Sequence, residues 1–148
     1  MSTYTQILYQ IVFSTKERKK VIDYKNQVEL YKYIYGIIKN KKSHLYRIGG
    51  VEDHIHIITH LHPSISLAEF VKDIKVSSSL WIKEKNIFPK FKSWQIGYAG
   101  FTYSINSKDK LIKYVKNQRE HHKKKTFVEE LKELLEEHNI DYDEKYLL

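Results

Sequence analysis

The alternation of apolar and polar positions predicts four β-strands. Residues 4–14 place Ile7, Tyr9, Ile11 and Phe13 on one face of a first strand. Further strands are predicted over residues 44–51, which glycines at 49 and 50 interrupt, and over 51–61 and 94–104. Because successive side chains of a strand point to opposite faces, the apolar positions identify the side of each strand that faces a core.

Two segments between these strands show apolar residues at helical spacing. The first follows Asp23, the expected N-cap, and ends in the lysine-rich segment 39–42; its expected inward positions are Val28, Tyr31, Ile34, Tyr35 and Ile38. The second opens with Ser66 and Glu69 at capping-box spacing and runs to about Lys83; its expected inward positions are Leu67, Phe70, Val71, Ile74 and Leu80.

Two more helices are expected after the fourth strand. One covers about 108–124 behind Ser107, and a short acidic one covers about 127–139 behind a second capping box, Thr126 to Glu129. The order β-α-β-β-α-β predicts an α+β fold of the ferredoxin-like, RRM-like kind: a four-stranded antiparallel sheet with two helices on one face and additional C-terminal helices. The other face needs a cover, which a third helix, a second subunit or nucleic acid would supply. Without repeats or linkers, residues 1–148 are interpreted as one domain.

Composition narrows the classes of function. The 148 residues include no cysteine, which excludes disulfides, zinc-thiolate sites and a thiol nucleophile. Residues 127–148 carry a net charge of −6. Since the whole chain has a net charge of +8, residues 1–126 carry +14. Such a basic region indicates a polyanion such as nucleic acid, or simply a solvated lysine-rich surface. Because no signal segment or membrane span is evident, we expect a cytoplasmic protein, nucleoid-associated in a bacterium or archaeon, that does not contact a membrane.

The third predicted strand carries a His-Ile-His sequence at residues 54–56. Ile55 and its neighbour Ile57 can enter the core, while His54 and His56 project together from the opposite face. Two imidazoles on one side of a strand can bind one divalent cation, although they can also be two polar residues on a solvated face. Asp53 and Glu52 precede the pair and are able to orient the imidazoles. His60 and His62 have the same parity but fall at the strand end, so we expect them at the surface.

A second pair of chemically active residues lies about sixty residues downstream. Tyr114 and Gln118 are four positions apart and therefore share a face of the predicted helix. A tyrosine alone is usually a packing residue, but Lys113, Lys116 and Arg119 surround this one with positive charge. A phenol that can attack phosphorus and an amide oxygen that can bind the same cation would then approach together.

Seven segments, in the right order and spanning nearly the whole chain, resemble the single-tyrosine insertion-sequence transposases of the HUH endonuclease superfamily, the IS200-like transposase family. They are residues 51–56, 61–64, 71–79, 94–98, 101–104, 114–122 and 142–146. The resemblance implies that His54 and His56 are the two motif histidines, Gln118 the third metal ligand and Tyr114 the nucleophile. The sequence departs from the family pattern at Gln10, where many relatives have histidine, and at Tyr98-Ala99-Gly100, where glycine more often comes first.

The resemblance also implies a substrate and a mechanism. The family acts on single-stranded DNA with hairpin ends, as a homodimer in which one subunit's tyrosine helix can complete the other subunit's metal site. We expect Tyr114 to attack the phosphodiester beside a Mg²⁺ or Mn²⁺ ion, giving a 5′-phosphotyrosine and a free 3′-OH without any nucleotide cofactor. Nearby cations are expected to favour the phenolate. One tyrosine per subunit means that two cuts need two subunits or two rounds, which favours a homodimer.

Some assignments stay open at this stage. The expected DNA contacts are basic residues and histidines outside the metal-ligand set: Lys16, Arg18, Lys72, Lys75, Arg119, His121 and His122. Alternative functions are a domesticated relative that acts on host DNA repeats, and a non-catalytic RRM-like nucleic-acid-binding module. The acidic C-terminal helix is interpreted as a soluble amphipathic end, with packing on the tyrosine helix or an electrostatic effect on DNA binding as alternatives.

Overall fold

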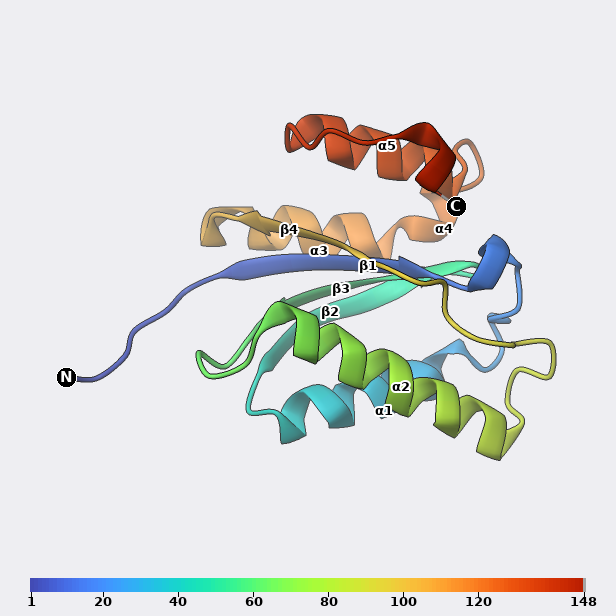
Figure 1. Ribbon diagram of the computed structural model, residues 1–148, viewed down its shortest axis with the longest axis horizontal. Coiled ribbons are helices and arrows are strands. Elements are labelled where there is room, and N and C mark those ends of the chain that lie inside the picture. The colour runs from blue at the N-terminus through green and yellow to red at the C-terminus, as the bar shows by residue number, and fades with distance from the viewer. Residues whose placement is uncertain (148) are drawn as a thin grey trace.

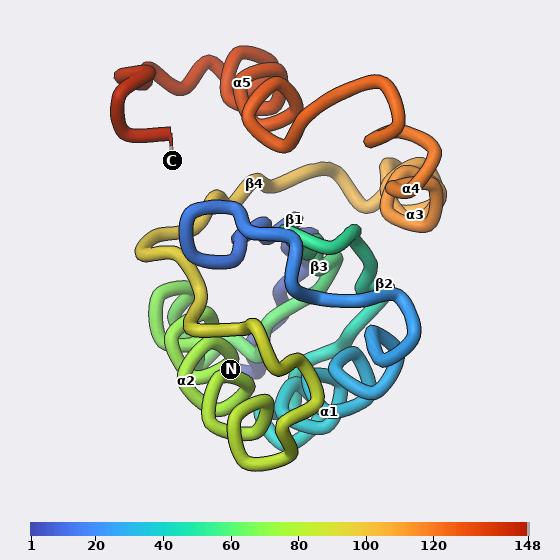
Figure 2. The backbone as a smooth tube through the Cα atoms, turned by 90° about the vertical axis from the view of Figure 1, so that its right-hand side faces the viewer, coloured from blue at the N-terminus to red at the C-terminus, as the bar shows by residue number. Residues whose placement is uncertain are grey.

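The computed structural model describes residues 1–147 and has the predicted ferredoxin-like sheet. Its strands are β1 (Leu8–Ser14), β2 (His44–Val51), β3 (His54–His60) and β4 (Ala99–Tyr103), all antiparallel in the order β2-β3-β1-β4. The helices α1 (Gln27–Asn40) and α2 (Leu67–Lys85) lie on one face of the sheet. The segments α3 (Lys108–Lys116), α4 (Gln118–His121) and α5 (Phe127–Glu137) lie on the other (Figures 1 and 2). Short 3₁₀ turns occupy η1 (Lys16–Arg18), η2 (Ile105–Ser107) and η3 (Glu144–Tyr146).

The main hydrophobic core lies between the sheet and the α1–α2 layer. The alternation predicted for β3 is confirmed, and that for the first strand is confirmed in part, since Ile11, Phe13, Ile55 and Ile57 all enter this core. Ile7, predicted on the same face, lies before β1 and is 40% exposed. The stripe predicted for the first two helices was partly wrong: Val28, Tyr35 and Leu80 are 55%, 50% and 65% exposed. In α1 the buried positions are Gln27, Leu30, Ile34 and Ile38, a stripe that leaves Val28 and Tyr35 on the solvent side. The helix starts at Gln27 behind Asn26 rather than directly after Asp23. Asp23 Oδ1 accepts a hydrogen bond from Asn26 N.

Three predicted strand ranges shorten. Strand β1 begins at Leu8, β3 covers residues 54–60 in place of 51–61, and β4 covers only residues 99–103. Trp94 lies before β4, bridges to Thr15, and packs edge-on against Phe13 and Phe91 in the core. Strand β2 has the predicted bounds, but its glycines do not interrupt it. A Cβ at Gly49 would lie 2.9 Å from Val115 Cγ1, so this glycine lets α3 pack closely on the sheet.

The sheet face that the fold pattern left open is covered by the chain's own C-terminal segments. Leu111 and Val115 of α3 pack with Leu8 and Ile58. Phe127, Leu134 and Leu135 of α5 pack with Val12 and Phe101. The acidic helix is therefore a docked layer of the structure, which corrects the preferred interpretation of it as a soluble end.

The predicted helix over 108–124 is divided. Helix α3 ends at Lys116, Asn117 leaves helical geometry with φ −94° and ψ 16°, and α4 forms one further turn from Gln118 to His121. The chain then turns to Thr126, whose side chain caps α5, while α5 ends at Glu137. Within residues 1–147, no helix combines the length and the apolar character needed to cross a membrane.

Candidate active site

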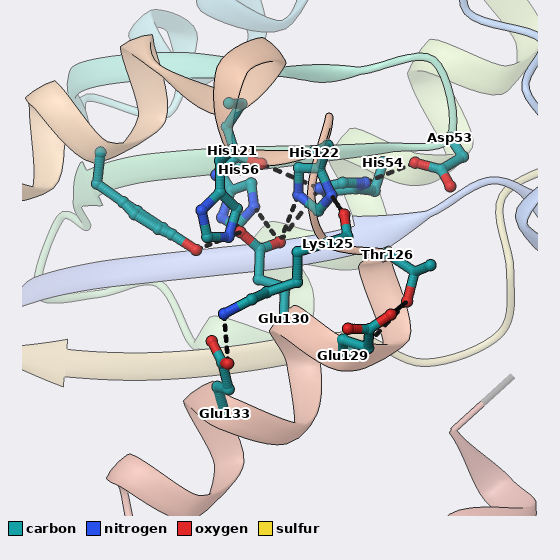
Figure 3. A network of polar contacts seen from close by, with 12 residues as sticks. Asp53, His54, His56, His121, His122, Lys125, Thr126, Glu129, Glu130 and Glu133 are labelled. Carbon is teal, nitrogen blue, oxygen red and sulfur yellow. Dashed lines mark hydrogen bonds and ion pairs between the residues drawn. The ribbon is translucent and has the colours of Figure 1, made fainter.

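A cluster of buried polar side chains lies between β3, α4 and α5, on the face opposite the main core. His54 and His56 of β3 are fully buried there. His122, which follows α4, and Glu130 of α5 point toward them (Figure 3). Together these four side chains make one group of potential metal-ligand atoms within 4.8 Å of one another. The prediction that His54 and His56 project from the same face of the strand is thus confirmed. Both side chains are buried there and do not face solvent.

The Glu130 carboxylate lies at the centre of this cluster. Its Oε1 is 3.0 Å from His56 Nε2, 3.1 Å from His122 Nε2 and 3.3 Å from His54 Nε2. Its Oε2 accepts a hydrogen bond from the Tyr114 hydroxyl and another, 3.0 Å long, from Gln118 Nε2. His121 Nε2 lies 3.3 Å from the same oxygen. One carboxylate therefore contacts every residue predicted for the metal and tyrosine roles.

A second set of contacts orients the imidazoles from outside. Asp53 Oδ1 lies 2.6 Å from His54 Nδ1, as expected for a residue that orients it. The carbonyl oxygen of Lys125 lies 2.7 Å from His122 Nδ1. Buried Gln10 lies between Tyr103, whose hydroxyl donates to Gln10 Oε1, and His56, whose Nδ1 is 3.1 Å from Gln10 Nε2. Gln10 therefore links Tyr103 to His56.

Burial and close contacts shift the proton affinities of the cluster. Burial lowers the pKa of His54, but hydrogen bonds with Asp53 and Glu130 and their charges outweigh it and raise this pKa to about 9. Burial lowers the pKa of His56. Burial favours protonated Glu130, yet the neighbouring imidazoles hold its pKa far below the usual range.

The tyrosine does not have the expected electrostatic environment. Burial, then the charge of Glu130 and the hydrogen bond to it, raise the pKa of Tyr114 well above its ordinary value. The expectation that nearby lysines favour the phenolate is wrong for this arrangement, because Glu130 is closer to the phenol than they are. Ionisation of Tyr114 is therefore unfavourable in this arrangement.

The orientation of the side chains fits a cation between them. Gln118 donates its Nε2 to Glu130, which turns Gln118 Oε1 toward His54 Nε2 at 3.1 Å. Because the Asp53 carboxylate can only accept, it fixes a proton on His54 Nδ1. The His54 Nε2 lone pair then faces two oxygens, and a positive charge, either a proton or a metal ion, is needed among them. Imidazole nitrogens with amide or carboxylate oxygens are a donor set that divalent ions accept.

Comparison with known proteins identifies the family. The family model described as "Transposase IS200 like" matches residues 3–118, more than half of the chain. The chain belongs to this family. It is a transposase, and the family suggests an enzyme that cleaves DNA. The matched region ends at Gln118, before His122 and Glu130.

Two solved structures have the same fold as this transposase. One is a putative transposase from Deinococcus radiodurans R1, with a TM-score of 0.63 and 20% identity over 80% of this chain and 95% of that chain. The other is a REP-associated tyrosine transposase bound to a REP hairpin, with a TM-score of 0.58 and 15% identity over 82% of this chain and 74% of that one. A sequence search finds no match among curated proteins.

The transposase brings the predicted residues together within one chain. The His54 and His56 rings, the Tyr114 hydroxyl and the Gln118 amide all lie beside Glu130. The sequence interpretation missed Glu130 altogether. One signal was available: Glu130 is an acid on the same helical stripe as Phe127, Leu134 and Leu135, where an apolar residue is usual.

The residues expected to contact DNA lie in different regions. Lys16 and Arg18 are in η1, while Lys72 and Lys75 are on α2, across the sheet from the cluster. Lys75 Nζ donates to the carbonyl oxygens of residues 95 and 97. Arg119 of α4 stacks over Tyr24 at 3.8 Å. His121 borders the cluster and His122 belongs to it, whereas His60 contacts the backbone of Ile7 and His62 contacts Ser64.

Two grooves reach the cluster. A groove of about 450 Å³ has Tyr114, His121 and Glu130 in its wall. A second, of about 480 Å³, has Asp53 and His122 in its wall. Five cations in this wall, Lys20, Arg119, Lys123, Lys124 and Lys125, outnumber its acids, Glu52, Asp53 and Glu129. A basic passage therefore leads to the side of the cluster away from the tyrosine.

Proposed function

We propose that this transposase cuts and rejoins single-stranded DNA at insertion-sequence ends through a covalent bond to Tyr114. The observation that carries the proposal is the position of the Tyr114 hydroxyl. It donates to a carboxylate that also contacts both histidines of the strand pair. His54, His56 and Gln118 are the proposed ligands of a divalent ion, Mg²⁺ or Mn²⁺.

The proposed reaction is a transesterification. The Tyr114 oxygen attacks phosphorus in line, the bond from phosphorus to the 3′ oxygen breaks, and the DNA 5′ end remains on the tyrosine as a phosphodiester. Glu130 Oε2 accepts the hydrogen bond that orients the Tyr114 hydroxyl. The phenolic proton leaves to solvent as the bond to phosphorus forms, and a solvent proton neutralises the released 3′ oxygen. When bound, the divalent ion supplies Lewis acidity and orients the scissile phosphate. A different 3′-OH can reverse the step and join new strands without ATP.

The substrate proposal rests on charge and on the related structure. The cationic groove beside His122 suits the phosphates of an unpaired strand that continues from the cleavage site. The REP-associated tyrosine transposase is bound to a REP hairpin, and we propose DNA hairpin ends as the substrate here as well. Because each chain supplies one tyrosine, we propose a homodimer for the two cuts of a complete excision.

The order of strands and helices left open two classes of function, a transposase and a non-catalytic RRM-like binding module, and the family match decides between them. An RRM-like binding module shares this sheet topology, but the chain belongs to a transposase family. The buried imidazoles of β3 also occupy positions where a base-stacking module would expose aromatic rings.

The tyrosine assignment is tested with single-stranded oligonucleotides from both ends of the chain's own genomic locus. Tyr114→Phe should form no covalent protein–DNA product, while hairpin binding stays near the wild-type level. Tyr33→Phe is the matched control, because Tyr33 stacks on Trp81 in the α1–α2 layer, on the other side of the sheet from the cluster. A normal adduct yield from Tyr114→Phe, or its loss only in Tyr33→Phe, would remove Tyr114 from the role.

The metal assignment has its own matched pair. His56→Ala should lose metal-dependent cleavage, whereas His60→Ala should keep it. Both histidines belong to β3 and share its parity, but His60 lies outside the cluster and its ring nitrogen contacts the backbone of Ile7. Wild-type cleavage rates for His56→Ala in Mg²⁺ or Mn²⁺ would contradict the proposed site.

A further inference from the structure

We propose that Glu130 and His122 are themselves ligands of the divalent ion, so that three imidazoles and a carboxylate hold it and the site prefers Mn²⁺, Co²⁺ or Zn²⁺ to Mg²⁺. This proposal rests on the proposed metal role of His54 and His56. It adds two residues that lie beyond the segment matched by the family model, which ends at residue 118. Both are supplied by the C-terminal part of the chain.

The distances from Glu130 Oε1 to the three imidazoles are close to those between neighbouring ligands of one ion. The three Nε2 atoms of His54, His56 and His122 lie 3.3, 3.0 and 3.1 Å from this oxygen. Neighbouring ligands of a tetrahedral ion with bonds of about 2.1 Å are separated by roughly 3.4 Å. A small outward movement of the four atoms therefore makes room for an ion among them.

The tautomer of His122 supports a ligand role. The Lys125 carbonyl oxygen, 2.7 Å from Nδ1, can only accept a hydrogen bond, so Nδ1 carries the proton. Nε2 is then a bare lone pair in the neutral ring. It is buried, makes no hydrogen bond with any of residues 1–147, and lies 3.1 Å from Glu130 Oε1. A buried lone pair that faces a carboxylate oxygen is destabilising unless a cation lies beside both.

Gln10 allows His56 to take the same tautomer. As oriented, Gln10 Nε2 faces His56 Nδ1, which leaves the ring proton on Nε2, where it is donated to Glu130. Half a turn of the carboxamide exchanges its nitrogen and oxygen. Gln10 Oε1 then accepts from His56 Nδ1, the Tyr103 hydroxyl accepts from Gln10 Nε2, and His56 Nε2 is free to bind a metal. Both arrangements leave the buried amide hydrogen-bonded.

The position of Glu130 is fixed by the packing of its helix. Phe127 and Leu134, on the same stripe of α5, are buried against the sheet beside Val12 and Phe101. The Thr126 side chain caps the first turn by accepting from Glu129 N. Glu130 is 1% exposed, so its carboxylate is directed into the cluster and away from solvent. A metal bound there would join α5 to β3 directly.

The ligand chemistry predicts the metal preference. Mg²⁺ favours oxygen ligands and retains water, whereas Mn²⁺, Co²⁺ and Zn²⁺ accept imidazole nitrogen more readily. Three imidazoles with one carboxylate therefore discriminate against Mg²⁺. The same set anchors α5, so bound metal should also protect the α5 backbone from hydrogen exchange.

The experiment measures binding of Mn²⁺ and Mg²⁺ to the whole metal-stripped chain by calorimetry, with hydrogen exchange of α5 as a second measurement. Four variants are compared with the wild type: Glu130→Gln, His122→Ala, His56→Ala and Glu133→Gln. Glu133 is the matched control, because it lies on the same helix but pairs with Lys125 outside the cluster. Circular dichroism in chelator establishes that each variant is folded.

The expected result has four parts. The wild type binds one Mn²⁺ per chain at least tenfold more tightly than Mg²⁺, and the ion slows exchange in α5. Glu130→Gln and His122→Ala each weaken Mn²⁺ binding by about 10–100-fold or more. Glu133→Gln matches the wild type, and His56→Ala abolishes binding.

Two outcomes would overturn the proposal and are distinguishable. If Glu130→Gln and His122→Ala bind Mn²⁺ as the wild type does while His56→Ala does not, the two new ligands are wrong and the original site remains. If His56→Ala also binds normally, the metal role in the proposed function fails as well. A Mg²⁺ affinity equal to that for Mn²⁺ would overturn the stated preference.

Discussion

The two faces of strand β3 bury side chains of opposite kinds. Ile55 and Ile57 enter an apolar core under α1 and α2, while His54 and His56, between and beside them, enter a polar cluster under α4 and α5. All four side chains are fully buried. The same strand therefore supports a stabilising core on one side and a buried polar network on the other.

The difference shows how the fold divides its tasks. On the apolar face, burial and helix packing stabilise the structure together, so each residue can be replaced only at a cost in folding free energy. On the polar face, each group depends on a specific partner: Asp53 for His54, Gln10 for His56 and the Lys125 carbonyl for His122. Buried polar groups are favourable only when such partners are complete.

The largest expected effect comes from the apolar face. Ile57→Ala should lower the free energy of unfolding by about 2–5 kcal/mol, because Ile57 is fully buried in the main core. Urea unfolding measures this change. Since Ile57 points away from the cluster, the protein that remains folded at low temperature should form the tyrosine adduct at the wild-type yield. A loss of adduct in fully folded protein would show that the two faces are not separate.

A dependence on pH is expected from the polar face. In chelator, stability should fall as the pH rises from about 6.5 to about 9. The folded-state pKa of His54 is raised to about 9, so its contribution is complete below the unfolded value of 6.5 and is lost through pH 9. The resulting decrease in the free energy of unfolding is about 3 kcal/mol at most. Glu130 has the opposite sign: its pKa is depressed, so its contribution is present above about pH 4.5 and is lost on acidification.

Thermal unfolding across this pH range measures the effect. His60→Ala should keep the wild-type profile, because His60 lies outside the cluster. Saturating Mn²⁺ should flatten the alkaline part, since the ion replaces the proton among the ligands. A flat profile in chelator would contradict the electrostatic account of the cluster.

A pair of glycines tests the close packing of α3. Gly49→Ala places a Cβ 2.9 Å from Val115 Cγ1 and 3.0 Å from the Val115 carbonyl oxygen, so α3 must shift. We expect a loss of about 1–3 kcal/mol in unfolding free energy and a lower adduct yield, because Tyr114 is the preceding residue. Gly36→Ala in α1 meets nothing within 4 Å and should stabilise by about 0.5–1 kcal/mol. Equal effects of the two changes would refute the packing argument.

The smallest expected effect compares two helix caps of the same chemistry. Ser66 and Thr126 each accept a hydrogen bond, 3.2 Å long, from the backbone N–H three residues later. Ser66→Ala and Thr126→Ala should each cost about 1 kcal/mol. Only Thr126→Ala should also weaken Mn²⁺ binding, because it loosens the first turn of α5, which carries Glu130. Unchanged Mn²⁺ affinity in Thr126→Ala would show that the first turn of α5 does not influence metal binding.

The sequence was sufficient for several features that one local rule determines. Strand alternation placed His54 and His56 on one face, and capping-box spacing located the starts of α2 and α5. The four-residue step from Tyr114 to Gln118 kept both side chains near Glu130 even though the helix breaks at Asn117. These features depend on neighbours in the chain.

Features set by tertiary packing were not predictable in this way. The docking of α5 brings Glu130 next to His56, which is 74 residues away. Helical periodicity identified an apolar stripe on α5 but not the surface on which it docks. Likewise, Gly49 was interpreted as a strand interruption. Its role is to let Val115 of α3 pack closely on the sheet, and this contact can be found only from the three-dimensional structure.

The most direct measurement of the central claim is the location of the covalent bond. The wild-type transposase is incubated with Mn²⁺ and single-stranded oligonucleotides from its own locus, then digested with a protease and analysed by mass spectrometry. We predict that the nucleotide mass is on the peptide that contains Tyr114 and that His54→Ala abolishes it. A nucleotide attached to another tyrosine, or an adduct that forms equally well without His54, would contradict the account.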